Sequence, residues 1–448
     1  MNMRRRNKDF PSLLHWVLPL MLVVVAVGIL LSGRVLSQNF ADLSRGPMID
    51  SRVTDWLQRL ASVVIIGICL ERLYSWFAGG RKGGSPVLAG AYIVYWLGTV
   101  GSPALFSAHP HLQHDYFYSL LIGTTAALSQ PDELRRVVEW VRTSLLVFLV
   151  ASAALVLVDP VLVLDTSYDQ GLLPGLPRYG GLAPHPVAMG IFCEVFLLSL
   201  WAFPFGRRWL NVAAWGLGLA SLFFAQSKTS WIGFIVCAMA MLAVRNLPGM
   251  WRRLADPKER EYGLVVCTVG ILGIAAVTGV LLFSDIGVKA ANFTSSEEGS
   301  QLLTLTGRDR IWEIAREEWH ANPVFGYGPG LWDDAFRDSI QMPNATSAHN
   351  QFYDTLSRSG AVGATALIAY TLVLLVLAIS TARATRGLSL AFFLAIALRS
   401  VSEIPLMIFG YGMELFAHLL LIITLAAAVR RQPEPVVRRA PASLAHPA

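Results

Sequence analysis

The sequence has few charged residues for its length. Only 15% of its 448 residues are Asp, Glu, Lys or Arg, whereas 54% are hydrophobic. A chain this long would ordinarily form two or three soluble domains, but composition takes precedence over length here. The low share of charge therefore argues against an ordinary soluble protein.

Cysteine is also scarce, and its four positions all lie inside apolar runs: Cys69, Cys193, Cys237 and Cys267. Neither a disulfide framework nor a zinc site is expected from them, and they fit small packing residues. The chain shows no internal repeat, which weighs against transporters built from inverted repeats. It also has no convincing carboxylate cluster for a divalent metal, so no metal or other cofactor is predicted.

Long apolar runs are abundant. They recur along the whole chain at lengths of roughly 17–25 residues, each enough to cross a bilayer as a helix. We predict an all-α integral membrane protein with about twelve transmembrane helices, at 13–34, 57–78, 86–106, 116–130, 143–164, 183–203, 210–225, 230–245, 263–284, 361–382, 388–407 and 412–429. Helices 1–9 occupy residues 1–284 and helices 10–12 occupy 361–429. We expect residues 285–360 to form a helical periplasmic lobe between helices 9 and 10, and 430–448 to form a basic, proline-rich, disordered tail.

Basic residues set the expected orientation. Arg81-Lys82, the amphipathic link 131–142, Arg207-Arg208 and the run from Arg252 to Arg260 all fall in connections that should stay cytoplasmic. The basic start, Met1 to Arg6, precedes a long apolar run with no small-residue cleavage site, so the first helix is expected to be uncleaved. Both termini are then cytoplasmic. The net charge of +6 is explained by these connections and does not indicate nucleic acid.

The lobe contains a polar, arginine-rich island from Thr306 to Gly363. Several arginines and a histidine over such a length cannot lie in hydrocarbon. Thr306 or Gly307 is expected to cap a helix from about Asp309 to His320. Arg308 at its N-terminus would then face an anion together with the free backbone N–H groups. The alternative is a lobe lying on the membrane with its arginines solvated.

A second helix is expected to begin at His349-Asn350 and to run directly into helix 10. A histidine at this junction suits a general base near neutral pH, although a histidine that merely caps its helix is the simpler interpretation. The orientation also places Arg178, Lys228 and Arg310 on the same outer face as Arg308 and His349.

These residues resemble the signature of a known family. His349-Asn350, nine residues and then Gly360-x-x-Gly363 looks like the hallmark of the bacterial O-antigen ligase/polymerase superfamily. The Gly307-Arg308-x-x-x-Trp312 opening and the Pro323…Gly326-x-Gly328 stretch are similar to the lobe of that family. Arg178-Tyr179-Gly180-Gly181, followed by His185-Pro186, looks like its upstream motif.

Two positions depart from the family pattern. Many members have an asparagine where this chain has Val187, so a hydrogen-bonding amide is absent. Lys228 stands where the family often has arginine, which leaves a point charge instead of a bidentate fork. Both departures concern the details of substrate binding.

The resemblance implies an inverting, metal-independent transfer of a glycan from an undecaprenyl-diphosphate carrier to a sugar hydroxyl, at the periplasmic face of the inner membrane. The acceptor is lipid A-core for a ligase, or a growing glycan for a polymerase, and the motifs do not separate the two. The resemblance implies that His349 is the general base. It implies four cations as diphosphate ligands: Arg178, Arg308, Arg310 and Lys228. It implies that Asn350, Tyr353 and Trp312 orient the acceptor. A transporter of lipid-linked oligosaccharide without chemistry is the competing hypothesis.

Two further groups leave their roles open. The loop containing His109, His111 and His114 is predicted to be a solvated interfacial loop, with zinc binding as the alternative. Arg399 and Glu403 are spaced one helical turn apart in helix 11. They would either pair structurally inside the bundle or line a substrate path.

Overall fold

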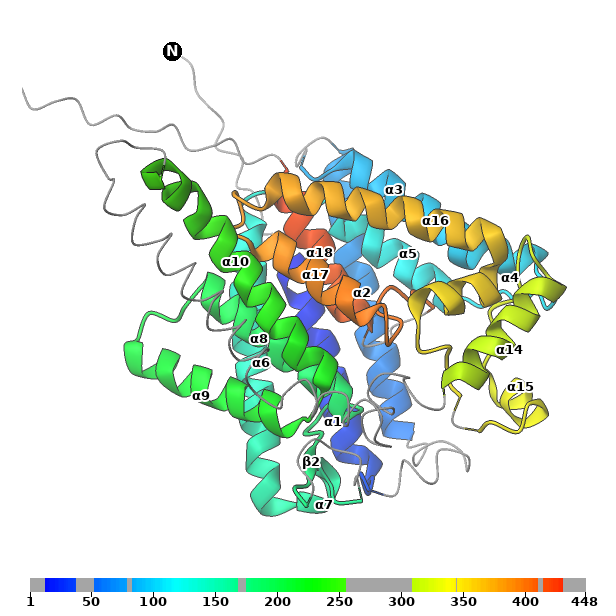
Figure 1. The fold of residues 1–448 in the computed structure, drawn as a ribbon, viewed down its shortest axis with the longest axis horizontal. Coiled ribbons are helices and arrows are strands. Elements are labelled where there is room, and N and C mark those ends of the chain that lie inside the picture. The colour runs from blue at the N-terminus through cyan, green and yellow to red at the C-terminus, as the bar shows by residue number, and fades with distance from the viewer. Residues whose placement is uncertain are drawn as a thin grey trace, which may run out of the picture.

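The computed structural model describes residues 13–37, 52–78, 83–167, 175–254, 308–343, 345–409 and 414–429. These parts are almost entirely helical, and long helices pack side by side in a bundle (Figure 1). A pair of two-residue strands, β1 (Leu164–Asp165) and β2 (Arg178–Tyr179), joins antiparallel beside the bundle. The helical fold class is confirmed.

The first half of the chain supplies most of the bundle. Its helices are η1 (Leu14–Trp16), α1 (Val17–Ser32), α2 (Arg52–Phe77), α3 (Pro86–Trp96), the π-helical turn η3 (Leu97–Gly101), α4 (Ser102–Phe106), α5 (Asp115–Ala126), α6 (Glu133–Val158), α7 (Pro160–Val163), α8 (Pro186–Ala202), α9 (Arg208–Phe224) and α10 (Lys228–Leu254). The second half supplies α14 (Arg308–Ala321), α15 (Asp334–Ser339), α16 (Gln351–Thr381), α17 (Leu388–Arg399) and α18 (Glu414–Ala428). From here on, the lobe means residues 308–350, a shorter segment than the predicted lobe at 285–360. Its helices α14 and α15 lie beyond one end of the bundle (Figure 1).

Six helical stretches in the described residues are long and apolar enough to cross a membrane, judged by length and composition. They are Leu14–Ser32, Arg52–Phe77, Pro86–Phe106, Glu133–Val158, Lys228–Asn246 and Gln351–Thr381. Three shorter apolar helices, α8, α17 and α18, accompany them. The chain is a multi-pass membrane protein. Predicted helix 9 (263–284), the capping pair Thr306-Gly307 and the tail 430–448 lie outside the described residues.

Several helix boundaries differ from the sequence prediction, including those of α6 and α17. The link expected at 131–142 is largely the first half of α6, which runs unbroken from Glu133, because its apolar positions Leu134, Val137, Val138 and Val141 are all buried on one face. Predicted helix 11 (388–407) ends early, since α17 stops at Arg399 and 400–409 is irregular. The second difference matters because it removes Glu403 from a helix.

Helix α16 breaks at Gly360, where φ is 60° and ψ is −159°. The break frees backbone groups on both sides, and the turn at 323–328 pairs with them. The N–H groups of Tyr327 and Gly328 donate to the carbonyls of residues 357 and 358 at 2.9 and 3.0 Å. The N–H groups of residues 361 and 362 donate to the carbonyls of residues 323 and 324 at 2.8 and 3.2 Å. The lobe is thereby fixed to α16 by backbone hydrogen bonds, as a kinked helix requires.

A buried arginine ties the end of α1 to the connections near β2. Arg34 is 4% exposed. Its guanidinium donates to the carbonyls of Leu162, Gly181, Ala183 and Pro184 at 2.6–3.0 Å. Burial lowers its pKa to about 10, so the side chain remains charged and keeps all its donors at neutral pH. The sequence prediction did not single out this residue.

Candidate functional site

Helix α16 begins where the sequence motif predicts. Asn350 is its N-cap: Oδ1 accepts from the N–H groups of Phe352 and Tyr353 at 3.0 and 3.1 Å. Its Nδ2 donates to the carbonyl of Val401 at 3.1 Å. A capping amide satisfies backbone donors that a helix start leaves unpaired. Asn350 therefore fixes the start of α16 and joins it to the turn that follows α17.

His349 precedes this cap with a left-handed backbone, at φ 45°. A residue with a side chain in that region carries strain of roughly 1–3 kcal/mol, and such strain persists only where neighbours impose it. Here the N–H of His349 donates to Oγ of Ser347 at 3.2 Å, and its carbonyl accepts from Nη1 of Arg308 at 3.3 Å. The backbone therefore turns at His349, and its imidazole points away from the axis of α16.

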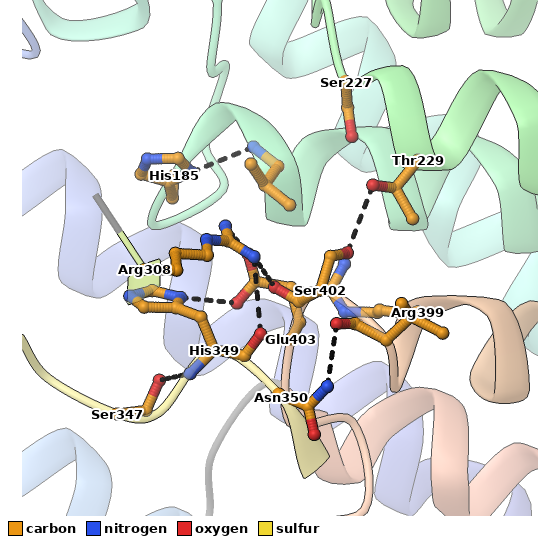
Figure 2. Close-up of polar contacts among 12 residues, drawn as sticks. His185, Ser227, Thr229, Arg308, Ser347, His349, Asn350, Arg399, Ser402 and Glu403 are labelled. Atoms are coloured by element: carbon orange, nitrogen blue, oxygen red, sulfur yellow. Dashed lines mark hydrogen bonds and ion pairs between the residues drawn. The ribbon is translucent and has the colours of Figure 1, made fainter. Parts of the chain in front are cut away.

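The imidazole meets a carboxylate. Nδ1 of His349 lies 3.2 Å from Oε2 of Glu403, while Oε1 of the same carboxylate lies 3.7 Å from Nη2 of Arg308. Figure 2 shows Glu403 between the two side chains. The side chains of His349, Arg308 and Glu403 are 27%, 24% and 19% exposed. They are therefore partly shielded, yet all three can be reached from outside.

Arg308 begins α14 and reaches the turn after α17. Its Nη1 donates to the carbonyl of Ser402 at 2.6 Å. The hydroxyl of Ser402 lies 3.2 Å from that of Thr229, in the first turn of α10. Three segments far apart in the sequence therefore meet here, from α10, from the lobe and from the turn at 400–403 (Figure 2). Burial lowers the pKa of Arg308 while Glu403 raises it, and the guanidinium stays charged.

A second set of polar residues lies beside the first. His185 caps α8, and its Nδ1 accepts from the N–H of Val187 at 3.0 Å. The pKa of His185 is lowered to about 3, mainly by burial and also by the charges of Arg178, Arg399 and His349, while Glu403 opposes them. His185 is therefore neutral at physiological pH and lies within electrostatic range of Arg178, Arg399 and the Glu403 carboxylate.

Arg178 and Lys228 belong to this second set. Arg178 on β2 is buried and donates from Nε to the carbonyl of Ala225 at 3.1 Å. Ala225 is the C-cap residue of α9, and Lys228 is the first residue of α10. Lys228 and His185 both lie within electrostatic range of Arg178, and His185 also lies within range of His349 and Glu403.

Arg310 differs from the other predicted cations. Its side chain is 59% exposed, and its Nη1 lies 2.7 Å from Glu313 and 3.8 Å from Glu317 on the same helix. It therefore lies on the outer surface of α14 and is not brought to His349. Trp312, by contrast, donates from Nε1 to the carbonyl of Ala348 at 2.9 Å and stacks on Tyr353 with ring centroids 5.4 Å apart. These two aromatics support the turn that carries His349.

An apolar groove begins beside the site. It has a volume of about 390 Å³ and runs between α16 and α17. Asn350, Gln351 and Val401 lie at its polar end, and Leu367, Ile368, Leu372, Phe393 and Ile396 line the rest. The groove thus connects the residues next to His349 with the apolar part of the bundle.

Comparison with known proteins now bears on this arrangement. Residues 213–368 match the family model described as O-antigen ligase. Over these residues the chain is similar to the O-antigen ligase-like superfamily. No match was found among curated proteins.

The matched region contains Lys228, Arg308 and His349, so the resemblance found in the sequence is confirmed for the family. The family match supports an O-antigen ligase- or polymerase-like function and indicates a glycosyltransferase-like enzyme. Arg178, His185 and Glu403 lie outside the matched residues. The sequence motifs pointed to Arg178 and His185, whereas the place of Glu403 in the site comes from the fold alone.

The structure also places the remaining candidates. The ring of His109 packs against Tyr327 with centroids 4.2 Å apart, while His111 and His114 contact their neighbours Gln113 and Asp115. Among the described residues, no group of three or more His, Cys, Asp or Glu side chains is arranged to hold a metal ion. The three histidines therefore serve separate local contacts.

The partnership of Glu403 was missed from the sequence. The prediction placed it in a helix, where it would either pair with Arg399 or line a substrate path with it, but Arg399 is the last residue of α17 and its Nη2 lies 3.9 Å from Glu414. The helix ends before Glu403 and turns the carboxylate toward the lobe. The signal available was Pro405, which disfavours a helix through the preceding residues.

Proposed function

We propose that this O-antigen ligase-like protein transfers a glycan from an undecaprenyl-diphosphate carrier to a sugar hydroxyl, with inversion at C1 and no metal ion. The main support is the convergence of His349 and Arg308, from different elements, at a partly exposed site beside an apolar groove. The base suits the acceptor hydroxyl, the cations suit the donor diphosphate, and the apolar groove suits the polyprenyl tail.

The chemical requirements follow from the bonds exchanged. The acceptor oxygen forms a bond to C1 of the donor sugar as the C1–O bond to the diphosphate breaks, so negative charge gathers on the leaving diphosphate. Cations fixed in advance near that charge lower the barrier. Arg308, Arg178 and Lys228 are our candidates, and Arg308 retains N–H donors beyond those bound to the carbonyls of residues 349 and 402.

His349 is the candidate base. Its Nδ1 faces Glu403, which leaves Nε2 on the opposite edge of the ring (Figure 2). A proton moving from the acceptor hydroxyl to Nε2 would increase the rate by roughly two to four orders of magnitude. Trp312 and Tyr353 would present an aromatic surface near the acceptor sugar, and Asn350 would hold the turn at His349 in place.

The groove between α16 and α17 suits the polyprenyl tail. It begins next to His349 and is lined mainly by aliphatic and aromatic side chains. A tail held there would place its diphosphate at the polar end. In this proposal the site faces the periplasm, the protein lies in the inner membrane and both termini are cytoplasmic.

The reaction is tested with purified protein in detergent, undecaprenyl-diphosphate glycan and excess chelator, with lipid A-core and repeat-unit acceptors supplied separately. We expect product on the core acceptor, which makes the protein a ligase. A ladder of longer lipid-linked chains would instead identify a polymerase with the same donor chemistry. No product with either acceptor, together with variants that still complement cells, would contradict the transferase proposal and favour transport.

Matched variants isolate the two central residues. His349→Ala and Arg308→Ala should each lower the rate at least about a hundredfold. Arg316→Ala and His320→Ala change the same residue types at exposed positions of α14, and should retain the wild-type rate. Equal losses in all four variants would point to damage of the lobe instead of the chemistry.

A further inference from the structure

Glu403 occupies an unusual position for a carboxylate in an apolar bundle. It lies four residues beyond the end of α17, and its N–H still donates to the carbonyl of Arg399 at 2.8 Å. The turn is held on its other side by Arg308, which binds the carbonyl of Ser402, and by Asn350, which binds that of Val401. The backbone that carries Glu403 is therefore fixed by the same segments that carry the candidate base and the candidate diphosphate ligand.

The two oxygens of Glu403 have different partners. Oε2 lies 3.2 Å from Nδ1 of His349 and Oε1 lies 3.7 Å from Nη2 of Arg308. An ionised carboxylate only accepts hydrogen bonds, so Nδ1 must carry the proton in this contact. That assigns the lone pair of neutral His349 to Nε2. Among the described residues, no hydrogen-bond partner is found for Nε2.

We propose that Glu403 is a positioning residue for the transfer reaction: it holds the imidazole of His349 through Nδ1, so that Nε2 is the basic nitrogen directed at the acceptor hydroxyl. This inference rests on the proposed function. During transfer the hydroxyl proton moves to Nε2 as the bond from oxygen to C1 forms and the C1–O bond to the diphosphate breaks. The resulting imidazolium is stabilised by Glu403, which remains ionised.

The surroundings of Glu403 keep it ionised. Burial raises its pKa, but the hydrogen bond and charge of His349 and the charges of Arg399 and Arg308 lower it more, and the net pKa is below the usual value. The groups that face the pair come from every adjoining element: Arg308 from α14, Arg399 from α17, and His185 ahead of α8. His185 is neutral, so it adds no charge of its own at neutral pH.

The contact of Glu403 with Arg308 has a second consequence. A donor diphosphate at Arg308 competes with Oε1 for the guanidinium, whereas Oε2 remains bound to His349. Binding of the donor therefore does not remove the support of the base. A change at Glu403 should accordingly alter kcat far more than the KM for the donor.

The test is the pH dependence of transfer in the purified full-length protein. Glu403→Gln keeps the shape of the side chain but removes its charge and allows the opposite tautomer of His349. We expect kcat to fall about 10- to 1,000-fold, with the donor KM changed by less than about threefold and the melting temperature preserved. Without the carboxylate, the imidazolium forms less readily, so the acidic limb of the rate profile should move about one unit or more to lower pH.

Two comparisons complete the experiment. Glu414→Gln is the matched control, because Glu414 contacts Arg399 and not His349; it should leave both kcat and the acidic limb unchanged. Glu403→Asp retains the charge and should restore the acidic limb to its wild-type pH and recover part of kcat.

The outcomes separate this inference from the proposed function. If Glu403→Gln keeps the wild-type kcat and pH profile while His349→Ala is inactive, the positioning role is wrong and the transferase proposal stands. If Glu403→Gln loses activity with a lower melting temperature and an unshifted acidic limb, its role is structural and the inference is again overturned. If His349→Ala is fully active, the proposed function itself fails.

Discussion

The break in α16 makes a quantitative prediction for Gly360→Ala. Gly360 adopts φ 60° and ψ −159°, a region that is essentially limited to glycine and costs other residues roughly 1–3 kcal/mol. A Cβ atom there would also collide with the carbonyl of Val324. Moving the turn at 323–328 away would weaken its four backbone hydrogen bonds, which contribute about 0.5–1.5 kcal/mol each. The total loss expected is about 2–5 kcal/mol.

The assay is thermal unfolding of the purified protein in detergent, followed by transfer activity at a temperature where the variant is folded. We expect the melting temperature to fall by on the order of 5 °C. We also expect activity to drop, because the segment before the break carries Asn350 and His349. Gly90→Ala is the control, since a Cβ at Gly90 in α3 meets nothing within 4 Å. A Gly360→Ala protein that melts with the control and transfers glycan at the wild-type rate would refute this reasoning.

Three further predictions concern other parts of the chain. Arg34→Ala leaves four carbonyls without their donor and should destabilise the protein by at least about 3 kcal/mol, since each buried acceptor left unpaired costs about 1–3 kcal/mol; a melting temperature within a degree of wild type would contradict this. The pKa of His185 is lowered to about 3 in the folded protein. Below about pH 6.5 His185 is therefore protonated in the unfolded chain but stays neutral in the folded chain. Stability should therefore fall as pH drops from about 6.5 toward 3, and His185→Asn should show a shallower fall in melting temperature over the same range. Arg310→Ala should keep activity within about threefold, because an exposed ion pair contributes little; a loss as large as that of Arg308→Ala would return Arg310 to the diphosphate site.

The sequence alone determined the class of protein and the outline of the site. Long apolar runs separated by basic connections can only be satisfied by membrane helices, since unpaired backbone groups are not tolerated in hydrocarbon. The His349-Asn350 motif and its paired glycines indicated the family because they encode a local event, a capped helix that breaks at Gly360. Such local features depend on nearby residues and are visible in the sequence. Helix ends are less so, and α6 and α17 both differed from prediction.

Only the tertiary structure decided which charges meet. Arg310 and Arg308 are two residues apart, yet one lies on the outer surface of α14 and the other reaches the turn after α17, because successive helical positions point in different directions. Glu403 was assigned to a helix and to Arg399 by its spacing. The early end of α17 turned it toward His349, 54 positions away in the sequence. Contacts over such separations depend on how helices pack, and no local pattern records them.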